Sequence, residues 1–303
     1  MDKKVTVVIP TYNRVKSLEK LIKSLEAQTM DKELFEVIVV DDGSTDRTLE
    51  FLKCKSKEAG INLRYFYQKN LGPATARNLA IEKTNAPLIA FTDDDCILDA
   101  NWLRALLEAL PNDEKCAGVG GKTIGTENRL ISKHIDSIGA FDHISEGGKV
   151  LYLVTNNALY RRECLKEVGG FCTDFSWAGG EDPELSYRLR NKGYYFTKTN
   201  DAVIKHIHGN SIRDFYDMYY RYGRGSILLT RHEYNPIFQY FETQPMKLFF
   251  GGLIEHLSKT KGYSLRLRLI SWLFSKIQNI AFYRGAQYQL NKSVSKNSND
   301  KSS

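Results

Sequence analysis

The chain has 303 residues, of which 42% are hydrophobic and 26% are charged. This composition excludes a mostly disordered chain and is enough for one large α/β domain with a helical extension. The net charge is +7, and the surplus is C-terminal, because residues 245–303 hold ten Lys or Arg residues against two acidic ones.

The first hundred residues alternate between patterns typical of strands and of helices. Continuous apolar runs predict strands buried on both faces, and apolar residues at helical spacing predict the helices between them. The expected elements are strands over residues 5–9, 35–40, 61–67 and 88–91 and helices that begin near residues 18, 46, 73 and 102. Alternating strands and helices predict a mostly parallel sheet, in which ligands bind at the carboxyl ends of the strands.

The second half of the chain is less regular. We expect a strand over residues 152–155 and a helix from Asp182 to Lys192, with Asp182 as its N-cap. Residues 291–303 contain almost no apolar side chains, so we expect them to be disordered.

Two of the predicted strands end in aspartates. Residues 35–40 lead into Asp41-Asp42-Gly43-Ser44, and residues 88–91 are followed by Asp93-Asp94-Asp95. Carboxylates gathered at one edge of a parallel sheet repel each other unless a cation lies between them. Mg²⁺ or Mn²⁺ suits such oxygen ligands and usually shares its coordination with substrate phosphates. Taken singly, each run also fits a turn, a helix cap or a solvated loop.

A set of motifs follows the same order as the predicted elements. Its members are Pro10-Thr11-Tyr12-Asn13-Arg14, Asp41-Asp42-Gly43-Ser44, Ala76-Arg77-Asn78, Asp93-Asp94-Asp95, Gly169-Gly170-Phe171 and Gly179-Gly180-Glu181-Asp182. Over about residues 4–210, this set resembles inverting glycosyltransferase family 2. The resemblance implies the α/β fold called GT-A, with a mostly parallel central sheet flanked by helices. The sequence pattern beyond the resemblance adds a C-terminal helical extension.

The resemblance also implies a division of the chain. The catalytic domain would cover residues 1–225, with a nucleotide-binding half over about 1–98 and an acceptor half over about 99–225. A basic amphipathic helical extension would follow over residues 226–290, before the expected disordered tail.

Carried over residue by residue, the resemblance implies a donor site and a metal site. The expected nucleotide-sugar-binding residues are Pro10, Thr11, Tyr12, Arg14, Asp42, Arg77, Asp93, Asp94, Trp177 and Gly180. The expected metal ligands are Asp93, Asp95 and His208, with His206 as a weaker candidate on the same strand face. Several of these residues also have a simpler interpretation. Arg77 would be an arginine on a helix surface, Trp177 would be an aromatic residue of the core, and each histidine would have a structural role.

The Glu181-Asp182 element supplies the catalytic carboxylate in the family. An inverting transfer needs a base that takes the proton of the acceptor hydroxyl, and we assign that role to Asp182. A divalent metal, Mn²⁺ or Mg²⁺, would stabilise the diphosphate leaving group as a Lewis acid. The alternative for Asp182 is that it only caps its helix.

The predicted function is that of an inverting hexosyl- or N-acetylhexosaminyl-transferase that uses a nucleotide sugar, with UDP preferred. Its acceptor would be a hydroxyl of a saccharide or of a lipid-linked saccharide. One alternative is a non-catalytic nucleotide-sugar-binding module. Another is a nucleotidyltransferase, which is disfavoured because residues 10–14 do not form a Gly-rich basic loop.

The C-terminal extension and the cysteines bear on partners and compartment. Leu and Phe residues alternate with Lys and Arg over residues 245–290, which fits a helix lying on an anionic membrane, a helical pair packed on the catalytic domain, or a homodimer interface. No nucleic-acid-binding motif accompanies the charge, so we expect no nucleic-acid partner. The five cysteines include no C-x-x-C pair, and the apolar run of residues 5–9 is too short for a signal peptide. We therefore expect a cytoplasmic protein, with peripheral contact at the inner face of the membrane as the variant to test.

Overall fold

The computed structural model describes residues 4–126, 130–207, 209, 211–231 and 265–299. These residues belong to two compact units. The first unit comprises residues 1–126, 139–177 and 181–208, and the second comprises residues 127–138, 178–180 and 209–303.

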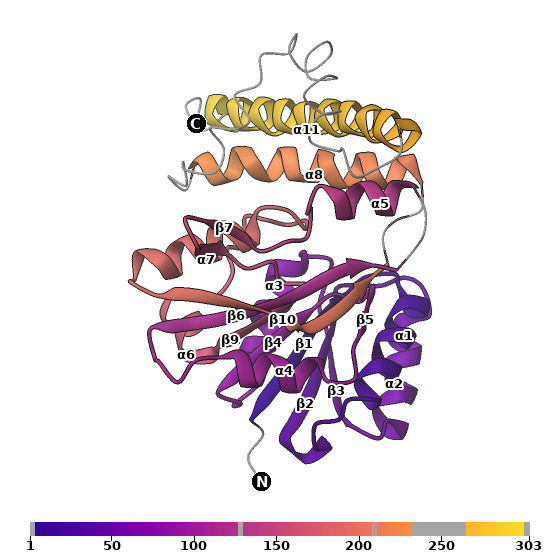
Figure 1. The fold of residues 1–303 in the computed structure, drawn as a ribbon, viewed down its shortest axis with the longest axis vertical. Helices are drawn as coiled ribbons and strands as arrows, with labels where there is room; N and C mark the ends of the chain where they lie inside the picture. The colour runs from indigo at the N-terminus through magenta and orange to yellow at the C-terminus, as the bar shows by residue number, and fades with distance from the viewer. Residues whose placement is uncertain (1–3, 127–129, 208, 210, 232–264, 300–303) are drawn as a thin grey trace. The chain divides into compact units, whose positions relative to one another are not determined.

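A sheet of eight strands forms the centre of the first unit (Figure 1). Its strands, in spatial order, are β3 (Asn62–Tyr67), β2 (Phe35–Asp41), β1 (Val5–Thr11), β4 (Leu88–Thr92), β9 (Asn157–Arg161), β6 (Cys116–Gly125), β10 (Tyr195–His206) and β5 (Cys96–Leu98). The first four strands of that order are parallel, β9 lies antiparallel between β4 and β6, and β10 is parallel to β6. The parallel half confirms the expected α/β sheet.

Helices cover both faces of this sheet (Figure 1). They are α1 (Val15–Glu26), α2 (Thr48–Glu58), α3 (Pro73–Lys83), α4 (Trp102–Ala109), α6 (Arg162–Glu167) and α7 (Glu181–Asn191), and a short 3-10 helix η1 (Lys32–Leu34) precedes β2. Residues of α1, α2 and α4 form one apolar core with alternate residues of the strands, and residues of α3, α6 and α7 form the other. Because every residue of β1 and β2 is buried, both strands are mainly apolar in the sequence, and the Thr6 hydroxyl donates a hydrogen bond to the buried Glu36 carboxylate.

Three local expectations differ from the structure. The strand expected over residues 152–155 is instead β8 (Lys149–Tyr152), paired with β7 (Ile144–Glu146), and Thr155 lies in a turn. Helix α7 begins at Glu181, so Asp182 lies inside its first turn rather than at the N-cap. The tail expected to be disordered is helical as far as Asn299, since extending an existing helix adds a hydrogen bond for each residue that it orders.

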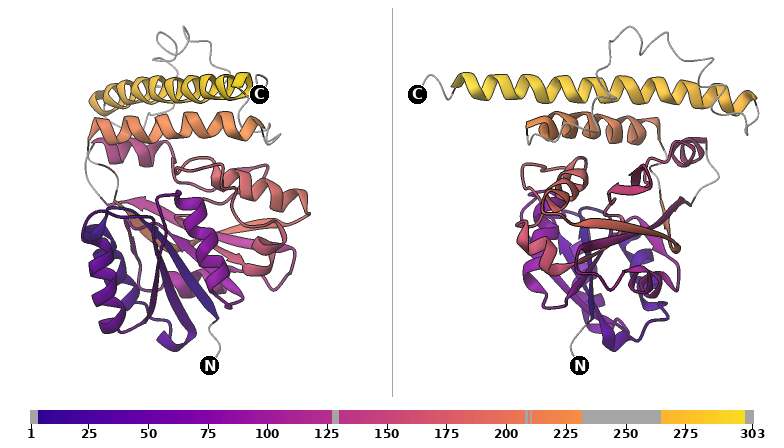
Figure 2. Two further views of the ribbon diagram at one scale, coloured as in Figure 1. Left: turned by 180° about the vertical axis from the view of Figure 1, so that it is seen from behind. Right: turned by 60° about the vertical axis from the view of Figure 1, so that its left-hand side comes forward.

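The second unit is helical and contains α5 (Leu130–Ser137), α8 (Ile212–Arg231) and α11 (Leu265–Asn299). Helices α8 and α11 run side by side in both views of Figure 2. Two glycines permit this close approach, because a Cβ on Gly223 would lie 1.9 Å from the Phe282 carbonyl oxygen and one on Gly285 would lie 1.9 Å from that of Tyr220. This unit takes in all of α8, whereas the expected extension began at residue 226.

Among the residues that the structure describes, no helix combines the length and apolar content that crossing a membrane requires. Residues 232–264, which carry much of the mixed apolar and basic pattern in the sequence, lie outside the described residues.

Candidate active site

Two loops at the carboxyl ends of β1 and β2 are joined by Asn13. Its side-chain Oδ1 accepts hydrogen bonds from the backbone N–H groups of Thr45 (2.7 Å) and Asp46 (3.2 Å), and its own N–H donates to Ser44 Oγ (2.8 Å). Asn13 has a positive φ of 54°, which asparagine adopts more readily than most other residues. The Pro-Thr-Tyr-Asn-Arg and Asp-Asp-Gly-Ser motifs therefore form one surface.

Asp42 organises the next loop. Its carboxylate accepts hydrogen bonds from Gln68 Nε2 (2.7 Å), Leu71 N (2.8 Å) and Gly72 N (2.9 Å). Gly72 has a positive φ of 94° and packs so closely on Ser176 that a Cβ would lie 2.5 Å from the Ser176 carbonyl oxygen. Asp42 thus holds the loop before α3, and its expected contact with a nucleoside base stays a prediction.

The three consecutive aspartates after β4 meet a cation and a hydroxyl from the first loop. Asp94 accepts a hydrogen bond from Thr11 Oγ1 (2.7 Å), and Arg14 pairs with both Asp94 and Asp95. Burial and the neighbouring Asp95 raise the pKa of Asp94 to about 7. The pKa of Asp95 falls well below its usual range, because the stabilising charges of His206 and Arg14 outweigh its burial. The structure therefore brings Thr11 and Arg14 together with Asp94 and Asp95, and their expected part in donor binding stays a prediction.

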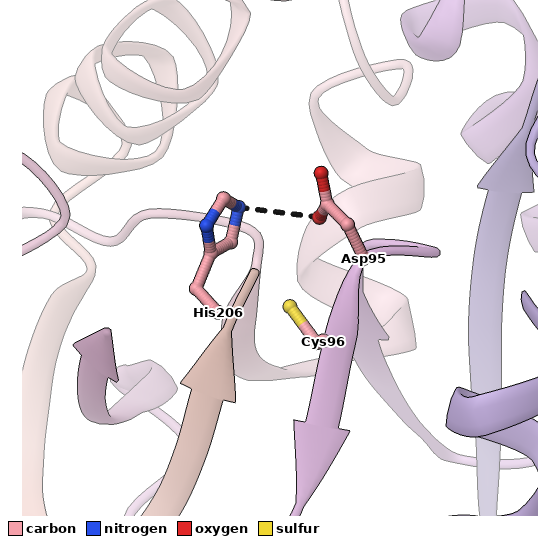
Figure 3. A group of neighbouring side chains, drawn as sticks. All are labelled: Asp95, Cys96 and His206. Carbon is pink, nitrogen blue, oxygen red and sulfur yellow. Dashed lines mark ion pairs between the residues drawn. The ribbon is translucent and has the colours of Figure 1, made fainter. Parts of the chain in front are cut away.

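Asp95 also faces His206, which lies at the end of β10, the strand that pairs with β5. His206 Nε2 lies 3.2 Å from Asp95 Oδ1, and Cys96 Sγ belongs to the same group of possible ligand atoms, all within 4.8 Å of one another (Figure 3). Carboxylate oxygen and imidazole nitrogen together suit Mn²⁺. Cys96 is a poorer ligand, because burial raises the pKa of its thiol and the thiolate is the form that binds metal.

Asp95 and His206 therefore fit a divalent metal. The sequence favoured His208 over His206, and His208 lies outside the described residues. His206 reaches the site because β10 pairs with β5, in a register that sets His206 opposite Cys96.

Arg77 links the aspartates to the Glu181-Asp182 element. Its Nη2 lies 3.0 Å from Asp93 Oδ1 and its Nη1 lies 3.1 Å from Glu181 Oε1. Only 3% of the Arg77 side chain is exposed, so its interpretation as a helix-surface arginine is wrong. The guanidinium also lies over the ring of Phe171, 5.5 Å from its centroid. One buried cation thus joins two acidic groups that are far apart in the sequence.

Asp182 is held from outside its own helix. Its Oδ2 accepts a hydrogen bond from Thr155 N (3.0 Å) and its Oδ1 accepts one from Thr155 Oγ1 (2.7 Å). Burial and the neighbouring Glu181 raise the pKa of Asp182 to about 7, against the opposing effects of Arg77 and the Thr155 bonds. A carboxyl group with a pKa near the working pH is well suited to general-base catalysis.

Four residues predicted to bind the donor, Pro10, Tyr12, Trp177 and Gly180, differ in how exposed they are. Tyr12 is 43% exposed, so its ring is open to stacking, whereas Pro10 lies buried within β1. Trp177 is half-buried. Gly180 follows Gly179, and a Cβ on Gly225 of α8 would lie 2.0 Å from the Gly179 carbonyl oxygen. Gly179 therefore packs closely against a helix, and the expected role of Gly180 in donor binding stays a prediction.

Two family models of glycosyltransferases match the sequence of this chain. The sequence model of Glycosyl transferase family 2 matches residues 6–169, and that of Glycosyl transferase family group 2 matches residues 88–284. The chain belongs to glycosyltransferase family 2. The motifs at Asp42, at the three aspartates and at Arg77 all lie inside the first match.

Curated relatives agree with this membership. The chain is 30% identical over 228 residues to a validoxylamine A glucosyltransferase of Streptomyces hygroscopicus subsp. jinggangensis, a match that covers 65% of this chain and 54% of the relative. The chain thus spans about half the length of the curated relatives of this name.

Solved structures show the same GT-A fold. A mannosyltransferase of Pyrobaculum calidifontis, PcManGT, in complex with GDP-Man and Mn²⁺, aligns with a TM-score of 0.67 at 17% identity, over 96% of this chain and 88% of its own. TarS of Staphylococcus aureus, residues 1–349 in complex with UDP, aligns with a TM-score of 0.58 at 20% identity, over 96% and 92% of the two chains.

Sequence reasoning missed two residues of this family 2 site. Asn13 stood inside a quoted motif but was given no role, although Asn at a strand end followed by a helix is a known turn-forming signal. Thr155 carried no usable signal, since only the folded chain brings it to Asp182.

Proposed function

We propose that this chain transfers a sugar from a nucleotide sugar, with UDP as the preferred nucleotide, to an acceptor hydroxyl with inversion at the anomeric carbon. The observation that carries the proposal is the Arg77 bridge between Asp93 and Glu181. It joins the acidic cluster suited to metal and diphosphate to the Glu181-Asp182 pair, which a simple binding module would not require.

In this proposal the chain's residues have separate tasks. Tyr12 offers a ring face to the nucleoside, and Arg14 exchanges a carboxylate partner for a phosphate of the donor. Asp182 takes the proton of the acceptor hydroxyl as that oxygen attacks, and its pKa of about 7 makes it an effective proton acceptor near neutral pH. Arg77 keeps the charge of Glu181 balanced while this happens.

Asp95 and His206 would hold a divalent metal, and Asp93 is near enough that its charge helps to raise the pKa of His206. When bound, such a metal supplies Lewis-acid stabilisation of the departing diphosphate. A similarity in fold to a mannosyltransferase solved with GDP-Man and Mn²⁺ supports Mn²⁺ as the ion to test first.

The acceptor and any membrane contact are further parts of the proposal. Leu269 and Leu273 lie one turn apart on α11 with 41% and 55% of their surfaces exposed, and the basic residues of the C-terminal sequence accompany them. This supports peripheral contact with an anionic membrane and hence a lipid-linked saccharide acceptor. Flotation with anionic and neutral liposomes tests the contact, and light scattering tests the alternative of a homodimer. Protein that floats with neither anionic nor neutral liposomes would contradict the proposed membrane contact.

A thermal-shift screen tests the central proposal. UDP, GDP, dTDP and their sugars are added with Mn²⁺, Mg²⁺ or EDTA, because a ligand of the native state raises the melting temperature. We expect a metal-dependent shift with one nucleotide family that disappears in Asp95→Ala, followed by nucleoside diphosphate release that Asp182→Asn abolishes. Binding with no release under any acceptor would favour a non-catalytic binding module, and no binding at all would refute the proposal.

A further inference from the structure

Thr155 is the one residue that hydrogen-bonds both carboxylate oxygens of Asp182 in the part of the chain that the structure describes. The backbone N–H bonds Oδ2 and the hydroxyl bonds Oδ1, at 3.0 and 2.7 Å. Two bonds from one residue to two different oxygens fix the plane of the carboxylate. Each oxygen keeps a further lone pair, so the group can still accept a proton from an acceptor hydroxyl.

The turn that carries Thr155 is anchored on both sides. On one side, Val154 N donates to His143 Nδ1 at 2.9 Å, and the His143 ring lies so close to Gly120 that a Cβ there would be 2.2 Å from Nε2. Burial lowers the pKa of His143 to about 4, so the ring is neutral near pH 7 and its Nδ1 stays an acceptor. A titration that would break this anchor therefore lies well below the working pH.

On its other side, the turn is held by Asn157. This side chain donates from Nδ2 to the Ala202 carbonyl oxygen (3.0 Å) and accepts at Oδ1 from Trp102 Nε1 (2.8 Å). Asn157 N closes the turn by donating to the Val154 carbonyl oxygen (3.2 Å). Thr155 itself is 1% exposed. A buried, doubly anchored turn is a rigid support for a catalytic group.

We propose that Thr155 is a positioning residue for the general base, which orients the Asp182 carboxylate and stabilises its ionised form. This inference rests on the proposed function, in which Asp182 takes the acceptor proton. It differs from a capping role for Asp182, because both bonds come from a turn outside α7 that is far away in the sequence.

The electrostatic surroundings make this stabilisation necessary. Glu181 is adjacent to Asp182 and raises its pKa, and Arg77 from α3 lowers it. From β9, Tyr160 contributes a hydroxyl that is neutral near pH 7, since burial and the Asp182 charge raise its pKa. Hydrogen bonds to a carboxylate favour its charged form, so the Thr155 bonds act in the same direction as Arg77.

Two substitutions separate the hydroxyl from the rest of the side chain. Thr155→Val keeps the shape and the backbone N–H bond but removes the bond to Oδ1, whereas Thr155→Ser keeps both bonds. We expect Thr155→Val to raise the Asp182 pKa by about one unit, and Thr155→Ser to leave it unchanged.

The pKa can be measured without any acceptor. The full-length protein is labelled with ¹³C at the aspartate carboxyl carbons and titrated by NMR, and the Asp182 resonance is identified by its loss in Asp182→Asn. An Asp182 resonance that titrates in Thr155→Val as it does in the wild type would overturn the proposal. Equal melting temperatures of the Val and Ser variants show that both proteins are folded.

Turnover gives a second readout, with release of UDP from UDP-glucose and from UDP-N-acetylglucosamine measured separately. At pH values below the Asp182 pKa, we expect kcat of Thr155→Val to be about tenfold lower than that of the wild type, and to converge with it at higher pH. The KM for the donor should not change. If Asp182→Asn turned over normally, the proposed function would be wrong while the NMR titration still decided the role of Thr155. If Asp182→Asn were inactive and the pH profile of Thr155→Val matched the wild type, only the role of Thr155 would be wrong.

Discussion

Replacing Arg77 by methionine removes the cation that joins Asp93 to Glu181 and leaves an unbranched apolar side chain at this buried position. Glu181 is the partner that suffers most, because only 4% of its side chain is exposed, whereas 32% of Asp93 is open to water. Removing one partner of a buried ion pair costs about 3–5 kcal/mol, since the other charge stays buried and loses its counter-charge. We therefore expect the free energy of unfolding of Arg77→Met to fall by an amount in this range.

Thermal and urea unfolding followed by circular dichroism measure this loss, which corresponds to a drop in melting temperature of roughly 6–20 °C. The matched control is the double variant Arg77→Met/Glu181→Gln, in which both charges of the buried pair are absent. Replacing a whole buried pair is much less costly than breaking it, so we expect the double variant to recover at least about 1.4 kcal/mol of the loss. The free energy of unfolding of Arg77→Lys should lie between those of the wild type and Arg77→Met. Lysine keeps the positive charge, but an ammonium group lacks the fixed fork with which a guanidinium donates to two carboxylates.

Two results would refute this reasoning. An Arg77→Met protein within about 1 kcal/mol of the wild type would mean that water reaches Glu181 and that the pair is not buried in solution. A double variant less stable than Arg77→Met alone would mean that Glu181 has a stabilising role independent of Arg77.

The other predictions concern the metal, the first loop and pH. Asp95→Ala should abolish the Mn²⁺-dependent part of the thermal shift given by a nucleoside diphosphate, and retention of that part would exclude Asp95 as a ligand. Asn13→Ala should lower the free energy of unfolding by about 1–2 kcal/mol, because the N–H groups of Thr45 and Asp46 lose their acceptor, and urea unfolding checks it. The contribution of Asp182 to stability should fall as pH rises from about 4 to 7, since its raised pKa means that this group binds more protons in the folded state than in the unfolded state in this window. The slope of melting temperature against pH should therefore be more positive in Asp182→Asn than in the wild type, and an equal slope would contradict the raised pKa.

The parallel half of the fold could be predicted because its sequence signal is local. Strands β1 and β2 are buried along their whole length, so residues 5–9 and 35–40 are apolar except for Thr6 and Glu36. Strand β9 (Asn157–Arg161) was not predicted, because its identity as a strand depends on antiparallel pairing with β4 and β6, which are distant in the sequence. The strand expected over residues 152–155 was also placed wrongly, because the actual strand β8 (Lys149–Tyr152) is defined by its pairing with β7.

The site divides in the same way. Asp42 and the aspartates at 93–95 directly follow strands, so the topology of a parallel sheet was enough to predict that they lie at one edge. His206 and Thr155 come from the antiparallel half, where register decides which side chain reaches the site. Residues two apart on a strand point to the same face of the sheet, so spacing alone could not choose between His206 and His208. The register of β10 against β5, which sets His206 opposite Cys96, decides it.

The charges of the site explain why a divalent metal fits it. Five carboxyl groups gather here: Asp93, Asp94, Asp95, Glu181 and Asp182. Arg14 and Arg77 pair with four of them, and His206 lies beside Asp95. Burial and a neighbouring carboxylate raise the pKa values of Asp94 and Asp182 to about 7. A nucleoside diphosphate would add further negative charge to the same edge of the sheet. Positive charge that enters with such a donor would therefore favour its binding, and in the proposed function Asp95 and His206 would hold that charge.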